Sequence, residues 1–271
     1  MGSMVSRRML LTAWTAPMWP GAVFAQRPAD RAGPLRLGVD HALVESGLAR
    51  SLQHAFGANT GIAVLLVPGP ALAVLEAIKN GEVDAALLDV PDAEAELDRQ
   101  GLVHDRQAIA QGEFILVGPA STGARGRRPP AGHSGAEALD RLRVQADADP
   151  ASLVFLSAGD GSGVHVAEQA LWRAARIAPL APWYVNADPK QSLIAQARAR
   201  GAYALVERGA WARQGGAPLA VLVEGDPVLV ESVHAMRSFR VSHPAGKIFV
   251  AWIAGGRGRA VVAAHGGYRP A

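Results

Sequence analysis

The amino-acid sequence predicts an α/β fold of two lobes, each a mainly parallel sheet flanked by helices. From Leu35 onward, short apolar runs alternate with segments of helical periodicity. Glycines and prolines separate these segments, and the pattern begins again after a stretch rich in Gly, Arg and Pro at residues 118–132. Alternating strands and helices are typical of parallel sheets covered by helices. The sequence shows no fixed-period repeat, which argues against a solenoid or a propeller.

The segments before residue 118 read as strand and helix units in turn. Ser46 can cap a helix N-terminus, and apolar residues follow it at helical spacing. Pro91 suits the first turn of a helix, where its missing N–H costs nothing. Gly61, Gly81 and Gly101 are expected to end the three helices. Apolar runs predict the strands at residues 35–39, 62–67, 85–88 and 114–117.

The second half of the chain repeats this pattern. Ser134 and Glu137 have the spacing of a capping box, which predicts a helix to about Ala148. Further helices are expected at residues 163–174 and 189–200, and strands at residues 153–156, 202–206 and 220–223.

Composition excludes several classes of function. The chain has 271 residues, 49% of them hydrophobic and 19% charged, which is an ordinary globular balance. The absence of cysteine excludes disulfides, thiolate metal sites and a cysteine nucleophile. Nucleic-acid binding needs a dense basic surface, and the densest basic cluster is Arg125, Arg127 and Arg128 in a proline-rich loop. We therefore expect no nucleic-acid partner.

The first 25 residues predict a signal peptide for export. Arg7 and Arg8 precede an apolar stretch, and small residues before and at Ala25 suit signal peptidase. The paired arginines resemble a twin-arginine signal, with an ordinary secretory signal as the alternative. Pro17 and Pro20 interrupt the apolar stretch, which argues against a retained membrane anchor. The predicted location is the periplasm.

Three loops follow predicted strands, where ligands bind in open α/β sheets. The first begins at Asp40, the second surrounds Gly69, and the third is the glycine-rich loop at residues 157–163. The third loop resembles a phosphate cradle but lacks the ending of a P-loop and the pattern of a nucleophile elbow. Its alternative reading is a turn in which Ser162 caps a helix.

The sequence also contains residue types that occur in two other kinds of site. Asp40, His41, Asp89, Asp160 and His165 could supply metal ligands, but no pair has the spacing of a known metal motif. A serine hydrolase would require Ser162 and His165 to meet in attack geometry, and a separation of three residues at a helix start does not favour this. We expect no metal, no cofactor and no catalytic residue.

The chain also resembles the periplasmic tungstate-binding proteins of ABC importers, across nearly all of residues 35–250. The segments that agree in order and spacing are Ser46–Leu48, Val90–Glu94, Glu113–Pro119, Ser157–His165, Trp183–Tyr184, Tyr203–Gly209 and Val223–Pro227. The resemblance implies a type II periplasmic binding protein with a cleft between its lobes. It implies that residues 33–118 and 233–271 form lobe I and residues 119–232 form lobe II.

The resemblance places the ligand in that cleft. The expected ligand-binding residues are Asp40, His41, Gly69, Asp89, Ser157, Asp160, Ser162, Gly163 and Arg208. The function that it implies is the capture of one small polar ligand by a monomeric protein, for an ABC permease in the inner membrane. The alternatives are a periplasmic sensor or delivery protein for a cationic ligand or metal complex and, more distantly, a metal-dependent or serine hydrolase.

Three departures from the family's pattern concern the ligand itself. Val39–Ala42, which contains Asp40 and His41, replaces the family's Thr-Thr-Thr-Ser run. Pro68–Pro70 replaces its Gly-Thr-Gly loop, and Ala158 replaces its loop arginine. A carboxylate at the position of an oxyanion costs several kcal/mol if it stays unpaired, by an order-of-magnitude estimate. We therefore predict that tungstate and molybdate bind weakly or not at all, and that Asp40 and His41 favour a cationic or hydrogen-donating ligand.

Overall fold

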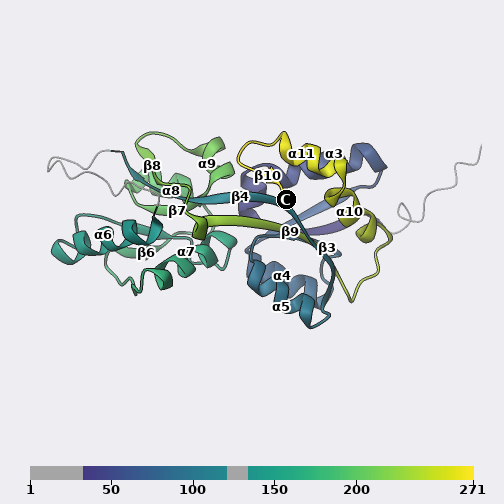
Figure 1. The fold of residues 1–271 in the computed structure, drawn as a ribbon, viewed down its shortest axis with the longest axis horizontal. Helices are drawn as coiled ribbons and strands as arrows, with labels where there is room; N and C mark the ends of the chain where they lie inside the picture. Colours follow the sequence, from purple (N-terminus) through teal and green to yellow (C-terminus); the bar gives the residue numbers. More distant parts are fainter. Residues whose placement is uncertain (1–32, 121–133) are drawn as a thin grey trace, which may run out of the picture.

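The computed structural model describes residues 33–120 and 134–271. The expected signal peptide and its cleavage site lie outside the described residues, as does the arginine cluster at residues 125–128. In the part of the chain that is described, no helix combines the length and the hydrophobicity needed to cross a membrane. Figure 1 shows two lobes side by side, joined by long strands. The predicted α/β class with two lobes is confirmed.

The first lobe is built on a sheet with a parallel centre. Strand β1 (Leu35–Asp40) pairs in parallel with β2 (Val64–Gly69) and with β3 (Ala85–Leu88). Strand β9 (Val230–Ser238) lies antiparallel to β3, and β4 (Val103–Pro119) lies antiparallel to β9. The short β10 (Arg269–Pro270) pairs with β4 and completes the order β10-β4-β9-β3-β1-β2.

Helices cover both faces of this sheet because successive strand residues face opposite sides. Leu35, Leu37 and Val39 of β1 share one core with Phe56 and Phe249, whose rings meet edge to face at 5.2 Å. On the other face, alternate residues of β3 belong to a separate core. Figure 1 shows the two groups of helices, which are α3 (Leu48–Thr60), α10 (Pro244–Ala254) and α11 (Gly256–Ala263) on one side, and α4 (Ala71–Asn80) and α5 (Pro91–Arg99) on the other.

The second lobe has its own sheet and core. Strands β7 (Ala204–Glu207) and β8 (Leu219–Val223) pair antiparallel to the end of β4, and β5 (Phe155–Ser157) pairs in parallel with β6 (Tyr184–Asn186). Trp172 fills the core against Phe155, with ring centroids 5.0 Å apart. The surrounding helices are α6 (Gly135–Ala148), α7 (Gly163–Ala174), α8 (Leu193–Arg200), α9 (Arg208–Gln214) and the 3-10 turn η1 (Pro227–Leu229).

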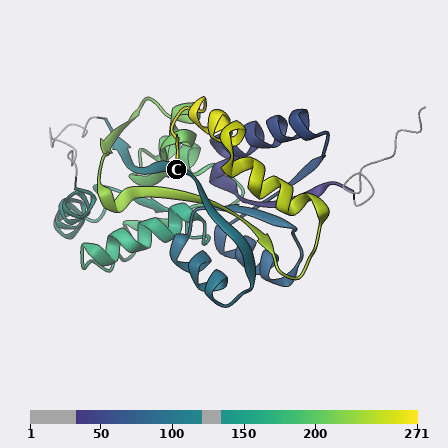
Figure 2. The same cartoon turned by 45° about the vertical axis from the view of Figure 1, so that its right-hand side comes forward.

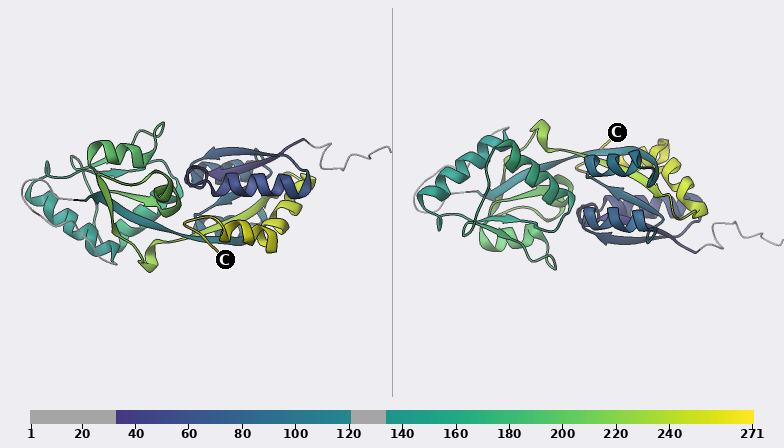
Figure 3. Two further views of the ribbon diagram at one scale, coloured as in Figure 1. Left: turned by 90° about the horizontal axis from the view of Figure 1, so that it is seen from above. Right: turned by 90° about the horizontal axis from the view of Figure 1, so that it is seen from below.

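Strands β4 and β9 carry the chain between the lobes (Figures 2 and 3). Residues Val103–Glu113 of β4 pair with β9, whereas Phe114–Val117 pair with β7 and pack in the cores of the second lobe. The packing of these residues therefore shows that the chain first passes from one lobe to the other a few residues before residue 118. The exact lobe limits at residues 118 and 232 stay a prediction.

Local signals placed several helix ends correctly. Pro91 lies in the first turn of α5, Ser134 accepts the N–H of Glu137 at 3.3 Å, and Gly81 ends α4 with a left-handed φ of 78°. The helix expected at residues 189–200 begins only at Leu193. Its first turn is replaced by a loop, because the carboxylate of Asp188 accepts hydrogen bonds from the residues that follow it.

Candidate functional site

A cavity of about 200 Å³ lies between the two lobes. The first lobe contributes the short helix α2 (His41–Glu45), which follows β1 directly. The second lobe contributes the glycine-rich loop after β5, the loop and helix start at residues 187–194, and the region where β7 ends. The charged side chains on its wall are His41, Glu45, Asp160, Asp188, Lys190 and Glu207. Strand ends converge here, as the sequence predicted.

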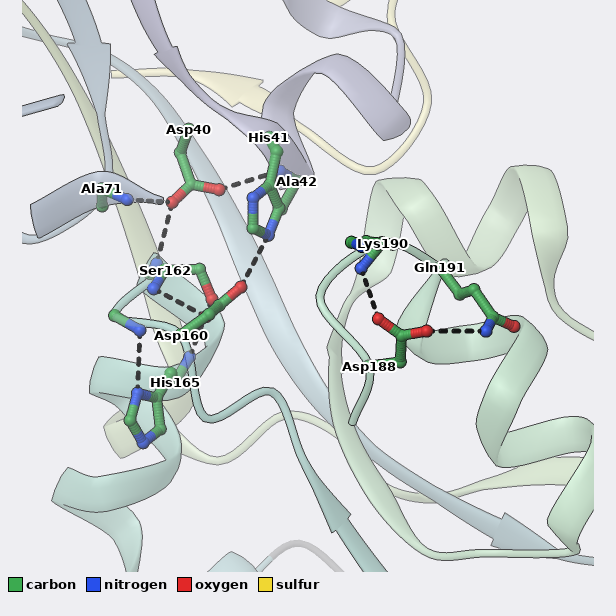
Figure 4. A network of polar contacts seen from close by, with 12 residues as sticks. Asp40, His41, Ala42, Ala71, Asp160, Ser162, His165, Asp188, Lys190 and Gln191 are labelled. Atoms are coloured by element: carbon green, nitrogen blue, oxygen red, sulfur yellow. Dashed lines mark hydrogen bonds and ion pairs between the residues drawn. The ribbon is translucent and has the colours of Figure 1, made fainter. Parts of the chain in front are cut away.

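Asp40 lies at the end of β1, directly behind this cavity, and its side chain is fully buried. Figure 4 shows its carboxylate facing three backbone N–H groups. Its Oδ1 accepts the N–H of Ala42 at 2.8 Å, and its Oδ2 accepts those of Ala71 and Gly163, each at 3.0 Å. Burial raises the pKa of the Asp40 carboxyl, while His41 in its protonated form and the N–H donors oppose the rise. Gly163 belongs to the other lobe, so this carboxylate bridges the two lobes.

A second buried carboxyl, that of Asp89, follows β3 and packs against Gly163. A Cβ atom built on Gly163 would lie 2.1 Å from both carboxyl oxygens of Asp89, so no larger residue fits there without movement. Neither oxygen has a hydrogen-bond partner among the residues that the structure describes. Burial raises the pKa of Asp89 well above its usual value, and the negative charge of Asp40 adds to the rise. A neutral carboxyl at this position avoids placing a second charge beside Asp40.

His41 and the glycine-rich loop make further contacts between the lobes. Nε2 of His41 lies 3.3 Å from Oδ2 of Asp160, which forms an ion pair when the imidazole is protonated. The backbone N–H of Leu72, in α4, donates to the carbonyl of Gly161 at 3.0 Å. Gly161 has a φ of 82°, a left-handed conformation that favours glycine and lets the loop approach α4. The loop therefore touches the first lobe through its backbone.

The opposite wall of the cavity is the loop before α8. The carboxylate of Asp188 accepts the N–H of Lys190 and the side-chain amide of Gln191, both at 2.9 Å, and these bonds lower its pKa. Lys190 lies on the same wall of the cavity. Sequence reasoning missed this loop because it assigned these residues to a helix. The signal that could have found it is Asp188 itself, since Asp commonly bonds to backbone two residues on.

Glu207 forms the floor of the cavity at the junction of β7 and α9. Its carboxylate accepts the N–H groups of Gly209 and Ala210, and its side chain is 1% exposed. Burial raises the pKa of Glu207 to about 7, partly offset by these two N–H donors. A carboxyl with this pKa changes its charge close to neutral pH.

Comparison with known proteins agrees with this architecture. A family model described as a PBP superfamily domain matches residues 33–246. The chain belongs to the PBP superfamily. Its fold is that of the type II periplasmic binding proteins, as the resemblance in the sequence predicted.

Three relatives of this PBP superfamily member are informative. It is 31% identical over 195 residues to a putative ABC transporter anion-binding protein of Haloferax volcanii, covering 70% of this chain but only 54% of that relative. It is 28% identical to the tungstate-binding protein TupA of Peptoclostridium acidaminophilum, covering 86% of this chain and 82% of that relative. The crystal structure of the tungstate ABC transporter from Geobacter sulfurreducens superposes with a TM-score of 0.69 at 25% identity, covering 85% of this chain and 98% of that one.

Most of the expected site residues of this PBP superfamily member come together. His41, Asp160 and Ser162 line the cavity, and Asp40, Asp89 and Gly163 form a buried group beside it. Gly69 is paired with Asp40 in the sheet register but does not line the cavity.

Two of the expected residues lie elsewhere in this PBP superfamily member. Ser157 is fully buried at the end of β5, near Glu168. Arg208 lines a separate hollow on the β4 side, where its Nε lies 2.7 Å from Oε2 of Glu113. The structure therefore does not bring Arg208 into the cavity between the lobes. The reason is that α9 begins at Arg208 and turns its side chain toward β4.

The described residues form neither an assembled serine hydrolase site nor an assembled metal site. Oγ of Ser162 accepts the N–H of His165 at 3.3 Å, and Nδ1 of His165 accepts the N–H of Gly161 at 3.0 Å. Both groups thus bind backbone N–H groups of α7 and of the loop before it, rather than forming a nucleophile and base pair. No group of three or more His, Asp or Glu side chains in the described part of the chain is placed to hold a metal ion.

Proposed function

We propose that this protein is a periplasmic solute receptor of an ABC importer, which captures one small polar ligand between its lobes. The relatives support the transport role, since they include a tungstate-binding protein and the anion-binding or tungstate-binding components of ABC transporters. The cavity supports the binding role, because both lobes line it and a ligand there could stabilise the joined state by touching both. An export signal over residues 1–25 would deliver the chain to the periplasm.

We further propose that the ligand is not a free tungstate or molybdate ion. The observation that carries this proposal is the buried carboxylate of Asp40, which already receives three N–H groups. Each added negative charge about 4 Å from it would cost on the order of 4 kcal/mol at an effective dielectric constant near 20. That cost weakens binding by about a thousandfold per charge.

The charges around the cavity favour a cationic or hydrogen-donating ligand, such as a small amine. Four of the side chains that line the cavity are carboxylates, whereas the basic ones are His41 and Lys190. The cavity is small beside the roughly 300–1,000 Å³ of drug-sized pockets, which restricts the ligand to a compact molecule. Asp160, whose side chain is 12% exposed, would attract a cation more strongly than a fully exposed carboxylate would. Glu207 adds to this attraction as the pH rises through its pKa of about 7.

Isothermal titration of the tag-free protein with sodium tungstate tests the exclusion of oxyanions. We expect no binding heat at micromolar protein, because Asp40 repels the dianion. Nanomolar binding would refute this part of the proposal.

Native mass spectrometry of protein purified from its own periplasm then identifies the ligand class by its mass. An adduct lost in Asp160→Asn but kept in Asp226→Asn, which removes a carboxylate outside the cavity, would locate the ligand between the lobes. No adduct in the wild type, or an adduct kept in Asp160→Asn, would contradict this assignment. Neighbouring genes for a permease and an ATPase would separate import from sensing or delivery.

A further inference from the structure

The carboxylate of Asp40 lies where helix α4 of the first lobe and helix α7 of the second lobe begin. Ala71 is the first residue of α4, and Gly163 is the first residue of α7. The N–H groups of both residues donate to the same oxygen, Oδ2 of Asp40, each at 3.0 Å. Figure 4 shows this oxygen between the two chain segments.

The N-termini of two helices converge on this one oxygen, and such a position favours the binding of an anion. The first N–H groups of a helix have no partner within the helix, and the helix dipole is positive at that end. Helix α4 begins after Pro70, whose side chain cannot cap it. Asp40 supplies the missing acceptor from β1, and it does the same for α7 across the gap between the lobes.

Independent contacts around Asp40 indicate that this arrangement joins the lobes. The N–H of Leu72 donates to the carbonyl of Gly161, directly beside the bonds of Asp40. The carboxyl of Asp89 is buried and packs on Gly163 without a hydrogen-bond partner among the described residues. These contacts come from the protein's own groups and require no solute.

We propose that the Asp40 carboxylate is a built-in anion, which occupies the position between α4 and α7 and holds the two lobes together in the absence of a solute. Because the anion is part of the chain, its effective concentration at this position is high and a free anion must compete with it. The ligand then binds in the neighbouring cavity, to lobes that are already joined. This inference goes beyond the proposed function, since the joining of the lobes can be measured without any ligand.

The distance between the lobes tests this inference. The chain contains no cysteine, so spin labels can be placed specifically by Ala95→Cys on α5 and Ala148→Cys on α6, both at exposed positions. In the wild-type background without solute, we expect one narrow distance distribution. Asp40→Ser should broaden or lengthen it, and the isosteric Asp40→Asn, which keeps one acceptor oxygen, should fall between.

A matched control separates joining of the lobes from loss of a buried carboxylate. Asp226 accepts the N–H of Gly135 at 2.7 Å and that of Val228 at 2.9 Å, so all three residues lie in the second lobe. Asp226→Asn should leave the distribution as in the wild type. A broad distribution in the wild type, or Asp40→Ser and Asp40→Asn distributions that superimpose on a narrow wild-type one, would overturn the proposal.

Sodium tungstate serves as a second probe of the same position. In Asp40→Ser the amides of Ala71 and Gly163 are free to receive an added oxyanion, so tungstate should bind at least about a thousandfold more tightly than to the wild type. It should also restore the narrow distance distribution. No gain in affinity would count against an anion position here. Tight binding by the wild type would refute the proposed exclusion of oxyanions, while the distance measurement still decides whether Asp40 joins the lobes.

Discussion

Glu207→Gln should change how the stability of the protein depends on pH. Glu207 is buried at the floor of the cavity, and burial raises the pKa of its carboxyl from 4.5 to about 7. A raised pKa means that the folded chain holds a proton that the unfolded chain has already released at intermediate pH. The stability contributed by the neutral carboxyl is therefore complete below about pH 4.5 and is lost as the pH rises to about 7.

The size of this loss follows from the two pKa values. One pKa unit corresponds to about 1.4 kcal/mol, so the shift of Glu207 to about 7 corresponds to about 3 kcal/mol of unfolding free energy. Gln is uncharged at every pH and still offers one oxygen to the N–H groups of Gly209 and Ala210. We expect Glu207→Gln to have nearly the wild-type stability at pH 4.5 and to be about 3 kcal/mol more stable than the wild type at pH 8.

Urea unfolding of both proteins between pH 4.5 and pH 8.5, followed by circular dichroism, measures this difference. Some decline with pH should persist in the variant, because burial also raises the pKa of Asp89 and Glu231 well above their usual values. The difference in unfolding free energy between the two proteins isolates the contribution of Glu207. An equal difference in unfolding free energy at pH 4.5 and pH 8 would refute the reasoning, because it would show that folding does not shift the pKa of Glu207.

Two further substitutions test the packing at Gly163 and the placement of Arg208 outside the cavity. Gly163→Ala places a Cβ atom 2.1 Å from the oxygens of Asp89, so it should lower the unfolding free energy by about 1–3 kcal/mol in urea titrations. Gly256→Ala, also at a helix start but with open space around it, is its control, and an equal loss in both variants would contradict the packing argument. Arg208→Ala removes the ion pair with Glu113 and should cost about 1 kcal/mol. It should leave the affinity for the ligand found by mass spectrometry within about twofold of the wild type, and a larger loss of affinity measured by titration calorimetry would place Arg208 in the site after all.

Local features of the sequence were sufficient for much of the fold. The cap at Ser134, the proline start at Pro91 and the glycine end at Gly81 act within one helical turn, so they can be read without the rest of the chain. The long strands that connect the lobes were harder to predict. Only the apolar end of β4 was expected, and β9, α10 and α11 were missed, because their burial depends on strands and helices that are distant in the sequence.

The sequence by itself determined the α/β class, the loops at the ends of its strands and the presence of a carboxylate at Asp40. Only the tertiary structure decided what that carboxylate does. Its partners Ala71 and Gly163 lie 31 and 123 residues away, and no local pattern records that two helix starts meet there. The structure likewise turned Arg208 away from the cavity and brought the loop of Asp188 into it. The physical reason is that caps and periodicity are short-range, whereas a site between lobes depends on how β4 and β9 bring the two sets of loops together.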